Sequence, residues 1–290
     1  MTSVDVLLVT YNTRDLLGRC LKSLERATSQ SSLDVSVHIF DNASSDGTAD
    51  FIREMSLDHV TIFSKENIFY GPAVNRLVRS SESEYVLMLN PDTEVPLGLL
   101  DDLVGVLREH PEVAIAFPSL TDANRVFQNS SYPFPTVEFE IAQELRGTKM
   151  ASYMRRLWNA DDVVQKFRSA PPADMPFDMN LVWSACIMMR RTEANRYGPF
   201  RQEYPMYDTD LDLCRRLSAS GRMAYWMSGS EVMHVGGASS SNESKQLMMK
   251  SARAKYYREY GGWLSSVAHV AATSALPRLK VLSRRLRSSR

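Results

Sequence analysis

Apolar residues in the first 118 positions alternate between short continuous runs and segments with helical spacing. In the first such segment, Leu16, Leu17, Cys20, Leu21 and Leu24 recur at intervals of three and four behind Thr13, which is typical of a capped helix. The continuous runs have the length of buried strands. Strands that alternate with helices predict an α/β fold with a mostly parallel sheet and helices on both faces. The predicted strands are Val4–Val9, Val35–Phe40, Val60–Phe63, Tyr85–Leu89 and Val113–Phe117, the last ending at Pro118.

The pattern loosens between residues 119 and 177, where prolines interrupt it and only 137–145 has helical spacing. After residue 177 the pattern is regular again and predicts an apolar strand, a helix that ends at Gly221, two short strands and a further helix. We expect one large domain over residues 1–240 and a helical extension with a basic tail over 241–290. The later segments are predicted at 181–189, 210–220, 224–227, 232–234 and 245–260.

Composition narrows the class of protein. The chain has 290 residues, is 44% hydrophobic and carries 34 basic and 34 acidic residues, so its net charge suggests no polyanionic partner and no nucleic acid. The three cysteines lie in apolar, periodic surroundings, which is typical of reduced thiols in a cytoplasmic protein. No apolar stretch reaches 18 residues and no basic segment precedes the first strand, so we expect neither a membrane span nor a signal peptide.

The fourth strand ends directly on Asn90-Pro91-Asp92. Proline cannot donate to a strand ladder, so pairing stops there and Asp92 is expected to point into a crevice at the carboxyl edge of the sheet. A carboxylate at such an edge suits a divalent cation that holds phosphates. The alternative is an ordinary turn with a structural aspartate.

Two neighbouring strand tips carry polar groups suited to a pyrimidine. Tyr11 offers a ring for stacking, and Asp41 offers an acceptor for the ring N3–H, with Thr10, Asn12 and Asn42 beside them. Ordinary turn and capping residues would give the same pattern. The chain has neither a Gly-x-Gly-x-x-Gly fingerprint nor a Walker A loop, which argues against a dinucleotide site and an NTPase.

Two residues in the second half are candidates for chemistry. Asp210 begins a helix on the same face as Leu213, Cys214 and Leu217, either as a charge that satisfies the helix dipole or as a proton acceptor in an active-site wall. Asp212 is expected to point in another direction. His234 ends a short strand before two glycines, and it is either a structural residue or a second contact to a metal or diphosphate.

Taken in order, these segments resemble the family 2 inverting glycosyltransferases of GT-A fold, particularly their bacterial rhamnosyltransferase-like branch. The resemblance covers about residues 4–260. The matching stretches are Leu8-Val9-Thr10-Tyr11-Asn12, Phe40-Asp41-Asn42-Ala43-Ser44-Ser45-Asp46-Gly47-Thr48, Leu89-Asn90-Pro91-Asp92-Thr93, Asp210-Leu211-Asp212-Leu213-Cys214, and His234 with its Gly-Gly-x-Ser-Ser tail.

The resemblance implies a nucleotide-sugar half over residues 1–118 and an acceptor half over 119–240. It implies that Asp210 is the catalytic base, that Asp92 holds Mg²⁺ or Mn²⁺ on the diphosphate with His234 as a second contact, and that Trp183 and Asp212 lie on the acceptor side. The nucleotide-binding residues that we expect are Thr10, Tyr11, Asn12, Asp41, Asn42, Asn67, Asn75 and Asn90.

Three positions depart from the family pattern. Thr209 stands where a glutamate usually precedes the catalytic aspartate. The Asn-x-Gly-Phe loop reads Asn67-Ile68-Phe69-Tyr70, which predicts that the flexible residue moves to Gly71. The Ser-Gly-Ala turn reads Trp183-Ser184-Ala185. These departures bear on the base and on the shapes of the donor and acceptor pockets.

The implied activity is the transfer of a sugar, with inversion, from a nucleoside diphosphate donor to a glycan or lipid-linked glycan. The resemblance favours dTDP-rhamnose as the donor, with a UDP-sugar as the other choice. A sugar-nucleotide pyrophosphorylase would share the sheet, but its Gly-rich N-terminal loop is missing. A non-catalytic nucleotide-sugar-binding or accessory subunit is the alternative from another class.

The end of the chain has its own pattern. From Leu264 onward, apolar residues alternate with basic ones, and residues 276–290 contain six basic residues and no acid. Such a segment suits a helix on an anionic membrane surface, which would make the protein peripheral on the inner face of the membrane. A packed helix with a solvated end is the alternative. Oligomeric state stays open.

Overall fold

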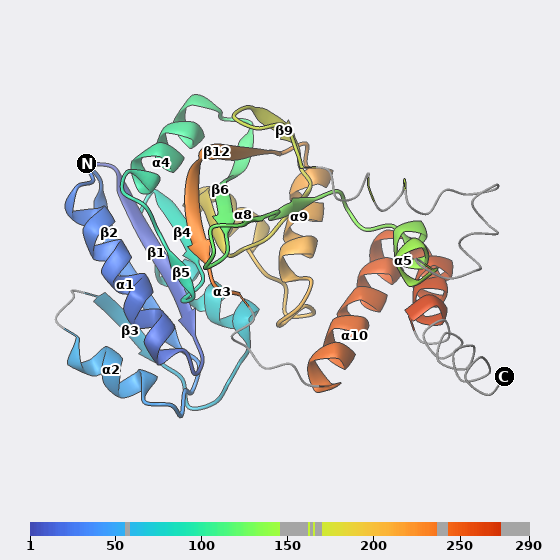
Figure 1. Ribbon diagram of the computed structural model, residues 1–290, viewed down its shortest axis with the longest axis horizontal. Helices are drawn as coiled ribbons and strands as arrows, with labels where there is room; N and C mark the ends of the chain where they lie inside the picture. Colours follow the sequence, from blue (N-terminus) through green and yellow to red (C-terminus); the bar gives the residue numbers. More distant parts are fainter. Residues whose placement is uncertain (56–58, 146–161, 163–164, 166–169, 237–242, 274–290) are drawn as a thin grey trace. The chain divides into compact units, whose positions relative to one another are not determined.

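The computed structural model describes residues 1–55, 59–145, 162, 165, 170–236 and 243–273 (Figure 1). The chain divides into two compact units, one of residues 1–131 with 171–240 and one of residues 132–170 with 241–290. The domain bounds expected from the sequence, 1–240 and 241–290, stay a prediction; residues 132–170, expected in the large domain, group here with residues 241–290.

The first unit is built on one mixed sheet in the order β3-β2-β1-β4-β11-β6-β12-β5. Strands β1, β2, β3 and β4 are parallel, and β11 enters antiparallel between β4 and β6. The sheet is therefore mostly parallel, as predicted. The strands of this sheet are β1 (Ser3–Thr10), β2 (Asp34–Asp41), β3 (His59–Phe63), β4 (Tyr85–Leu89), β5 (Thr93–Glu94), β6 (Val113–Thr121), β7 (Phe127–Gln128), β9 (Pro176–Asp178), β11 (Cys186–Arg190) and β12 (Met223–His234). Strands β8 (Ser131–Tyr132) and β10 (Leu181–Val182) pair with each other in a separate two-stranded sheet.

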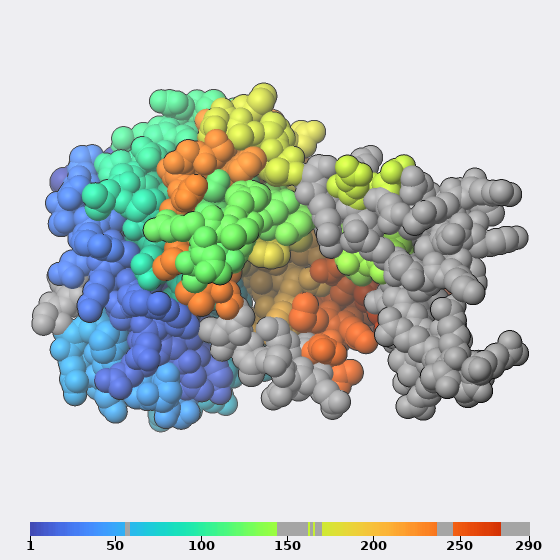
Figure 2. Space-filling view, in the orientation of Figure 1, coloured from blue at the N-terminus to red at the C-terminus, as the bar shows by residue number. Residues whose placement is uncertain are grey.

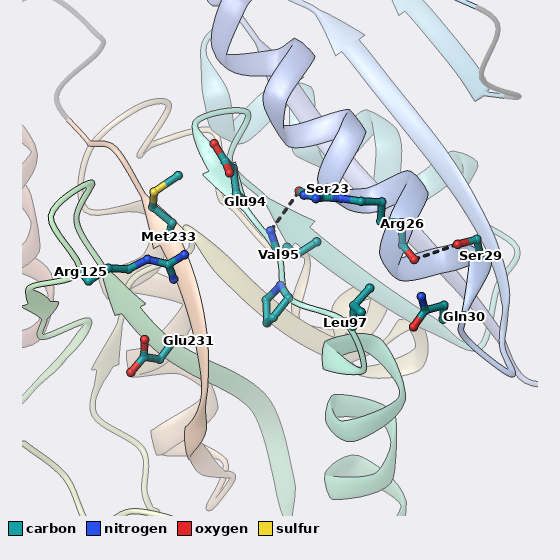
Figure 3. Close-up of a pocket in the computed structure, with 11 residues that line it drawn as sticks. Ser23, Arg26, Ser29, Gln30, Glu94, Val95, Leu97, Arg125, Glu231 and Met233 are labelled. Atoms are coloured by element: carbon teal, nitrogen blue, oxygen red, sulfur yellow. Dashed lines mark hydrogen bonds between the residues drawn. The ribbon is translucent and has the colours of Figure 1, made fainter.

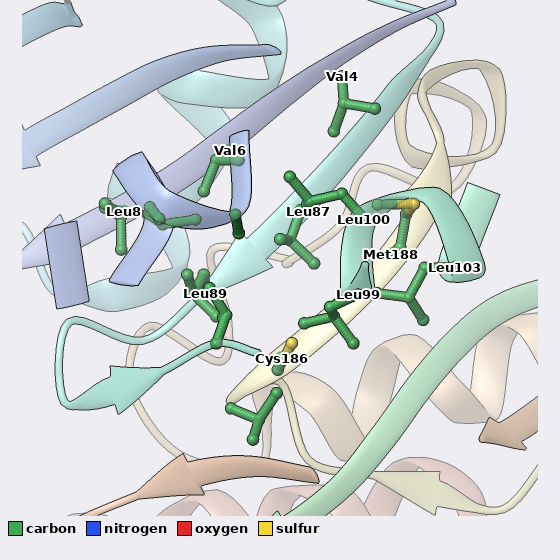
Figure 4. Close-up of a cluster of buried hydrophobic side chains, with 14 of the residues drawn as sticks. Val4, Val6, Leu8, Leu87, Leu89, Leu99, Leu100, Leu103, Cys186 and Met188 are labelled. Carbon is green, nitrogen blue, oxygen red and sulfur yellow. The ribbon is translucent and has the colours of Figure 1, made fainter. Parts of the chain in front are cut away.

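Helices cover both faces of this sheet. Alternate strand residues, such as Val6, Leu87 and Met188, point to one face and pack with α4 in a continuous apolar core (Figure 4). Helices α1 and α2 contribute to the same core. Helix α3 contacts β1 and β2, and α8 contacts β4 and β11. The helices are α1 (Arg14–Ser29), α2 (Thr48–Glu54), α3 (Tyr70–Ser80), α4 (Leu99–Glu109), α8 (Arg191–Tyr197) and α9 (Thr209–Ala219).

Three strand predictions were wrong in detail. Strand β6 continues through Pro118 to Thr121, because the pairing with β12 carries on beyond a register shift at that point. The apolar run 181–189 is two strands, since a turn at 183–185 separates β10 from β11. The two short strands at 224–227 and 232–234 are one strand, β12, with an irregularity between Met227 and Glu231. Figure 2 shows orange residues of β12 beside green residues of the segment that contains β7 at the surface, where Phe127 of β7 lies against Trp226 of β12.

The second unit contains α5 (Val137–Leu145), α10 (Glu243–Tyr260) and a helix over residues 262–273. Glu140 of α5 joins the helices, since it accepts from Arg253 Nη1 at 2.7 Å and from the Tyr257 hydroxyl at 3.3 Å. No described helix is both long enough and apolar enough to cross a bilayer. The predicted tail at 276–290 lies outside the described residues.

Candidate active site

A cleft of about 380 Å³ opens where β1, β2 and β4 end. Its walls bring together Asp92, from the turn after β4, and Asp210, from the start of α9, although they are over a hundred positions apart in the chain. The roles expected of the two carboxylates from the sequence require this convergence. The other predicted site residues that line the cleft are Tyr11, Asn42, Asn67, Asn90 and His234.

Asp92 and His234 form one corner of the cleft. Asp92 Oδ1 lies 3.6 Å from His234 Nε2, and Asp92 Oδ2 accepts the backbone N–H of Gly236 at 3.1 Å. Strands β5 and β12 pair through Thr93 and His234, and this pairing aligns the two side chains. The second glycine and the serines that follow lie outside the described residues.

Gln128, which the sequence did not single out, fixes the His234 ring. Its amide Nε2 donates to the His234 carbonyl at 3.1 Å, and its Oε1 lies 3.0 Å from the ring Nδ1. Because a carbonyl only accepts, the amide orientation is determined, and Nδ1 must carry the proton that Oε1 accepts. This leaves Nε2 facing Asp92, and Nε2 is the nitrogen that would bind a metal in the neutral form of the ring.

The donor set at this corner fits a divalent cation that is shared with a substrate. Among the described residues, no group of three or more His, Cys, Asp or Glu side chains is placed to hold a metal by itself. Mg²⁺ is commonly bound through one or two carboxylates together with substrate phosphates. Asp92 and His234 would thus supply two ligands, and a diphosphate would supply others.

Asp210 is half-buried and also lines the cleft. Its Oδ1 accepts the backbone N–H of Leu211 at 2.9 Å, and the backbone of Ser184 also hydrogen-bonds the carboxylate. Burial, and then the negative charge of Asp208, raise the pKa of Asp210 to about 6 despite these bonds. A carboxylate in this range is deprotonated at neutral pH and more basic than a solvated one, which suits a general base.

Three further residues complete the wall around Asp210. Tyr70 lines the cleft near both carboxylates, and its hydroxyl lies 3.4 Å from the Ser184 carbonyl. Asp208 lines the cleft in the left-handed conformation (φ +56°), a strained state for a non-glycine residue that is commonly found at functional sites. Thr209 is buried at the first position of α9. Tyr70 ends the Asn67–Tyr70 loop of the family pattern, whereas Asp208 belongs to no pattern that would have identified it from sequence.

The tip of β2 carries a carboxylate oxygen without a partner. Asp41 Oδ2 accepts the backbone N–H of Ser44 at 3.2 Å, whereas Asp41 Oδ1 is buried and has no hydrogen-bond partner. A buried unpaired acceptor is costly, so a ligand N–H would stabilise it. Next to it, Asn42 lines the cleft and accepts the Ile68 N–H at 2.8 Å, joining β2 to the loop before α3.

The prediction of a flexible Gly71 was wrong. Phe69 takes a positive φ (+67°), which the Asn67 side chain supports by accepting the Phe69 N–H at 2.8 Å. Gly71 is needed for space instead, because a Cβ there would lie 3.2 Å from the Tyr204 carbonyl and 3.3 Å from the Pro205 carbonyl. Its N–H donates to Pro205 at 2.9 Å, so it couples Tyr70 to the segment leading to Asp210.

Replacing Gly71 by alanine should therefore destabilise the fold by about 1–3 kcal/mol, because backbone atoms must move to accept the methyl group. Gly105 in α4 is the matched control, since a Cβ there meets nothing within 4 Å. Gly105→Ala should leave stability unchanged or raise it by about 0.5–1 kcal/mol. Urea unfolding measures both, and a Gly71→Ala protein as stable as the wild type would contradict this account.

Two predicted site residues lie away from the cleft. The carboxylate of Asp212, expected on the acceptor side, is fully buried and paired with Arg201 Nε at 3.0 Å and Arg216 Nε at 2.9 Å, so it holds α9 in place. Asn75, expected to bind nucleotide, bonds the backbone of Phe200 through both ends of its amide. Both expectations are corrected to structural roles.

Three other expected residues support the cleft without lining it. Thr10 is buried and its hydroxyl bonds that of Thr13 at 2.6 Å. The Asn12 side chain accepts the Ser45 N–H at 2.7 Å and so holds the loop after β2. Trp183 is partly exposed beside Ser184, with its backbone N–H on the Ser130 carbonyl at 2.8 Å.

A second cavity of about 350 Å³ lies between α1 and the segment after β5, with part of β12 on its other side (Figure 3). Its charged residues are Arg26, Arg125, Glu94 and Glu231. Glu94 also pairs with Arg19, at 3.8 Å. Because two basic and two acidic groups face this cavity, it favours neither an anion nor a cation.

Comparisons with known proteins agree with this geometry. The family model described as "Glycosyl transferase family 2" matches residues 5–169. The chain is 27% identical over 248 residues to an N-acetylglucosaminyl-diphospho-decaprenol L-rhamnosyltransferase of Mycobacterium tuberculosis, covering 81% of this chain and 76% of that protein. It is 24% identical over 178 residues to the rhamnosyltransferase WbbL of Escherichia coli, covering 59% and 60%.

Solved structures of glycosyltransferases share the fold. A mannosyltransferase from Pyrobaculum calidifontis, in complex with GDP-Man and Mn²⁺, superposes with a TM-score of 0.58 at 15% identity, covering 94% of this chain and 70% of that one. TarS 1–349 of S. aureus, in complex with UDP-GlcNAc, gives a TM-score of 0.54 at 14% identity, covering 89% and 67%. The predicted GT-A architecture is confirmed at the level of the fold.

Proposed function

The chain belongs to glycosyl transferase family 2, and from this premise we propose that it transfers rhamnose from a dTDP-rhamnose donor, with inversion, to a lipid-linked glycan. The observation that carries the proposal is the convergence of Asp92 and Asp210 on one cleft. The likeness to two rhamnosyltransferases supports the sugar, and a UDP-sugar is the other donor to test.

The donor would lie across the tips of β1, β2 and β4. The unpaired Oδ1 of Asp41 is suited to accept the N3–H of thymine or uracil, and exposed Tyr11 is suited to stack on the base. Asn42 and Asn67 offer amides to the ribose side of the cleft. Thymine and uracil share the N3–H, so this contact favours a pyrimidine without choosing between the two.

The diphosphate would lie at the corner formed by Asp92 and His234. These two residues would hold Mg²⁺ or Mn²⁺, which when bound neutralises the negative charge of the departing nucleoside diphosphate. Gln128 keeps His234 in the tautomer that this role needs. Asp210 would accept the proton of the acceptor hydroxyl as that oxygen attacks the anomeric carbon, while the bond from that carbon to the diphosphate oxygen breaks.

The acceptor is proposed to be a saccharide on a polyprenyl diphosphate, because the first M. tuberculosis relative is named for such a substrate. Ser184, in the turn at 183–185, lines the cleft and hydrogen-bonds Asp210 through its backbone, and the neighbouring Trp183 is suited to pack against a sugar ring. An acceptor anchored in lipid implies that the enzyme works at the membrane surface.

The proposal is tested by supplying dTDP-rhamnose or UDP-sugars with Mg²⁺ or Mn²⁺ and a short-chain prenyl diphosphate GlcNAc. We expect dTDP to be released only when donor, metal and acceptor are all present. NMR should then show a product whose anomeric configuration is opposite to that of the donor. Donor binding without release in any combination would instead support an accessory, nucleotide-sugar-binding subunit.

A further inference from the structure

The helix over residues 262–273 carries large apolar side chains on its surface. Trp263 and Leu264 are 68% and 74% exposed, and Val267 and Val270 are each close to half exposed. With 3.6 residues per turn, these four positions fall within one arc of roughly 120°. We call them the C-terminal apolar face.

The opposite side of this helix is more polar and packs against α10. Ser266 Oγ donates to the Ala254 carbonyl at 2.9 Å, and the His269 ring lies with its centroid 5.0 Å from that of Tyr257. Lys250 Nζ donates to the Thr273 carbonyl at 3.3 Å. A helix of a soluble domain normally buries its apolar stripe and exposes polar residues. This helix is attached through its polar side, so its apolar face is available to a partner.

The surrounding charge indicates what kind of partner this face would meet. Residues 243–290 contain eleven lysines and arginines against two glutamates, whereas the chain as a whole is neutral. The helix over 262–273 has no Lys, Arg, Asp or Glu. An uncharged apolar face flanked by basic sequence is suited to a bilayer with anionic headgroups, where the apolar side chains enter the interface and the basic ones stay at the phosphates.

Two other partners fit less well. A symmetric dimer through this face would bring two strongly basic segments together, and like charges at an interface oppose association. Nucleic acid would account for the basic residues, but recognition of phosphates leaves exposed tryptophan, leucine and valine side chains without a role.

We propose that residues 262–273 dock this protein on an anionic membrane surface through Trp263, Leu264, Val267 and Val270. The basic sequence on both sides of the helix strengthens the attraction to anionic lipid. This inference rests on the proposed function for its purpose, because it would hold the enzyme where a lipid-linked acceptor resides. The contacts themselves are independent of which sugar is transferred.

Flotation of the full chain with vesicles tests the proposal. We expect binding to phosphatidylcholine vesicles that contain phosphatidylglycerol, and weaker binding to pure phosphatidylcholine or at high salt, where headgroup attraction is screened. The double variant W263S/L264S should partition at least about tenfold less, because each residue buries a large apolar side chain. Val126→Ser, which removes an equally exposed apolar side chain from the other unit, should bind as the wild type does.

A second measurement identifies the contact directly. Brominated lipids should quench tryptophan emission of the wild type, and Trp263→Phe should abolish most of that quenching while vesicle binding persists. Thermal unfolding of W263S/L264S should match the wild type, since both side chains are exposed. Absence of vesicle binding, or full binding by a folded W263S/L264S protein, would overturn the proposal. So would a concentration-dependent dimer, seen by light scattering, that this variant loses.

The failure of this inference can be told apart from the failure of the proposed function. Transfer to the water-soluble, short-chain acceptor should be the same for wild type and W263S/L264S. If transfer occurs and no protein floats with anionic vesicles, only the proposal of membrane docking is wrong. If the protein floats and transfers nothing with any donor, only the glycosyl transfer is wrong.

Discussion

Replacing Asp210 by asparagine is expected to lower kcat by at least about a hundredfold while donor affinity stays within a factor of about three. General-base assistance typically contributes about 10²–10⁴-fold, and asparagine keeps the shape of the side chain without its basicity. The donor contacts proposed for Asp92, Asp41 and Tyr11 are left intact. Steady-state kinetics with isothermal titration of the donor separates the two quantities. Normal turnover by D210N would remove Asp210 from the mechanism.

The pH dependence gives an independent check on the same residue. Because burial and Asp208 raise the pKa of Asp210 to about 6, the proposed base should be protonated and inactive below that pH and active above it. In the wild type, kcat/KM should therefore rise with pH through an inflection near 6. The pH dependence of kcat/KM reports the pKa of the group in the free enzyme. Asp208→Asn removes one of the causes that raise the pKa, so its inflection should move to lower pH. An unchanged inflection would show that Asp208 does not act on the base.

Loss of activity in D210N should come without loss of folding. A buried carboxylate whose folded pKa lies above its unfolded value destabilises the fold at pH values above both, since the charged form is held in a poor environment. The neutral asparagine removes that penalty. At pH 7 we expect D210N to unfold at a temperature no lower than the wild type, whereas a marked decrease would mean that the kinetic defect reflects misfolding.

The carboxyl-edge residues could be located from sequence because they depend on local rules. A buried strand followed by Pro91 leaves Asp92 at a strand tip, and Asp41 follows its strand in the same way. In a mostly parallel sheet such tips meet at one edge, so their neighbourhood follows from the order of strands alone. The same argument extends to Asn42 and Asn90, which line the cleft.

The errors arose where a residue's role depends on a distant partner. Asp212 lies two positions after Asp210, yet Arg201 and Arg216 hold it in the core, and nothing in the local pattern pairs Arg201 with α9. Gln128 can hydrogen-bond the His234 ring only because β12 brings His234 next to it, although the two are 106 positions apart in the chain. Gly71 was expected to be the flexible residue because propensity disfavours a positive φ at Phe69, whereas the Asn67 side chain stabilises that conformation.

Replacing Asp92 by alanine should abolish the metal dependence of donor binding. In the wild type, we expect Mg²⁺ or Mn²⁺ to tighten binding of the nucleoside diphosphate sugar, because Asp92 and His234 supply only part of a coordination sphere and the diphosphate supplies more. Loss of an outer partner of a metal ligand commonly costs 10–100-fold in metal affinity, so loss of a direct ligand should cost at least about tenfold. Isothermal titration with and without metal measures this difference.

The wild type and D92A are compared by the ratio of the donor dissociation constants measured without and with metal. This ratio separates the contribution of the cation from the direct contacts between the protein and the nucleobase. In D92A the ratio should fall to about one, while binding in the absence of metal stays near the wild-type value or improves, because a negative charge has been removed from the diphosphate corner. Asp50→Ala, which removes a carboxylate that is 76% exposed and outside the cleft, should keep the wild-type ratio. If the ratio in D92A equals that of the wild type, Asp92 is not a metal ligand. The only role left for its carboxylate would then be to orient Gly236 and His234.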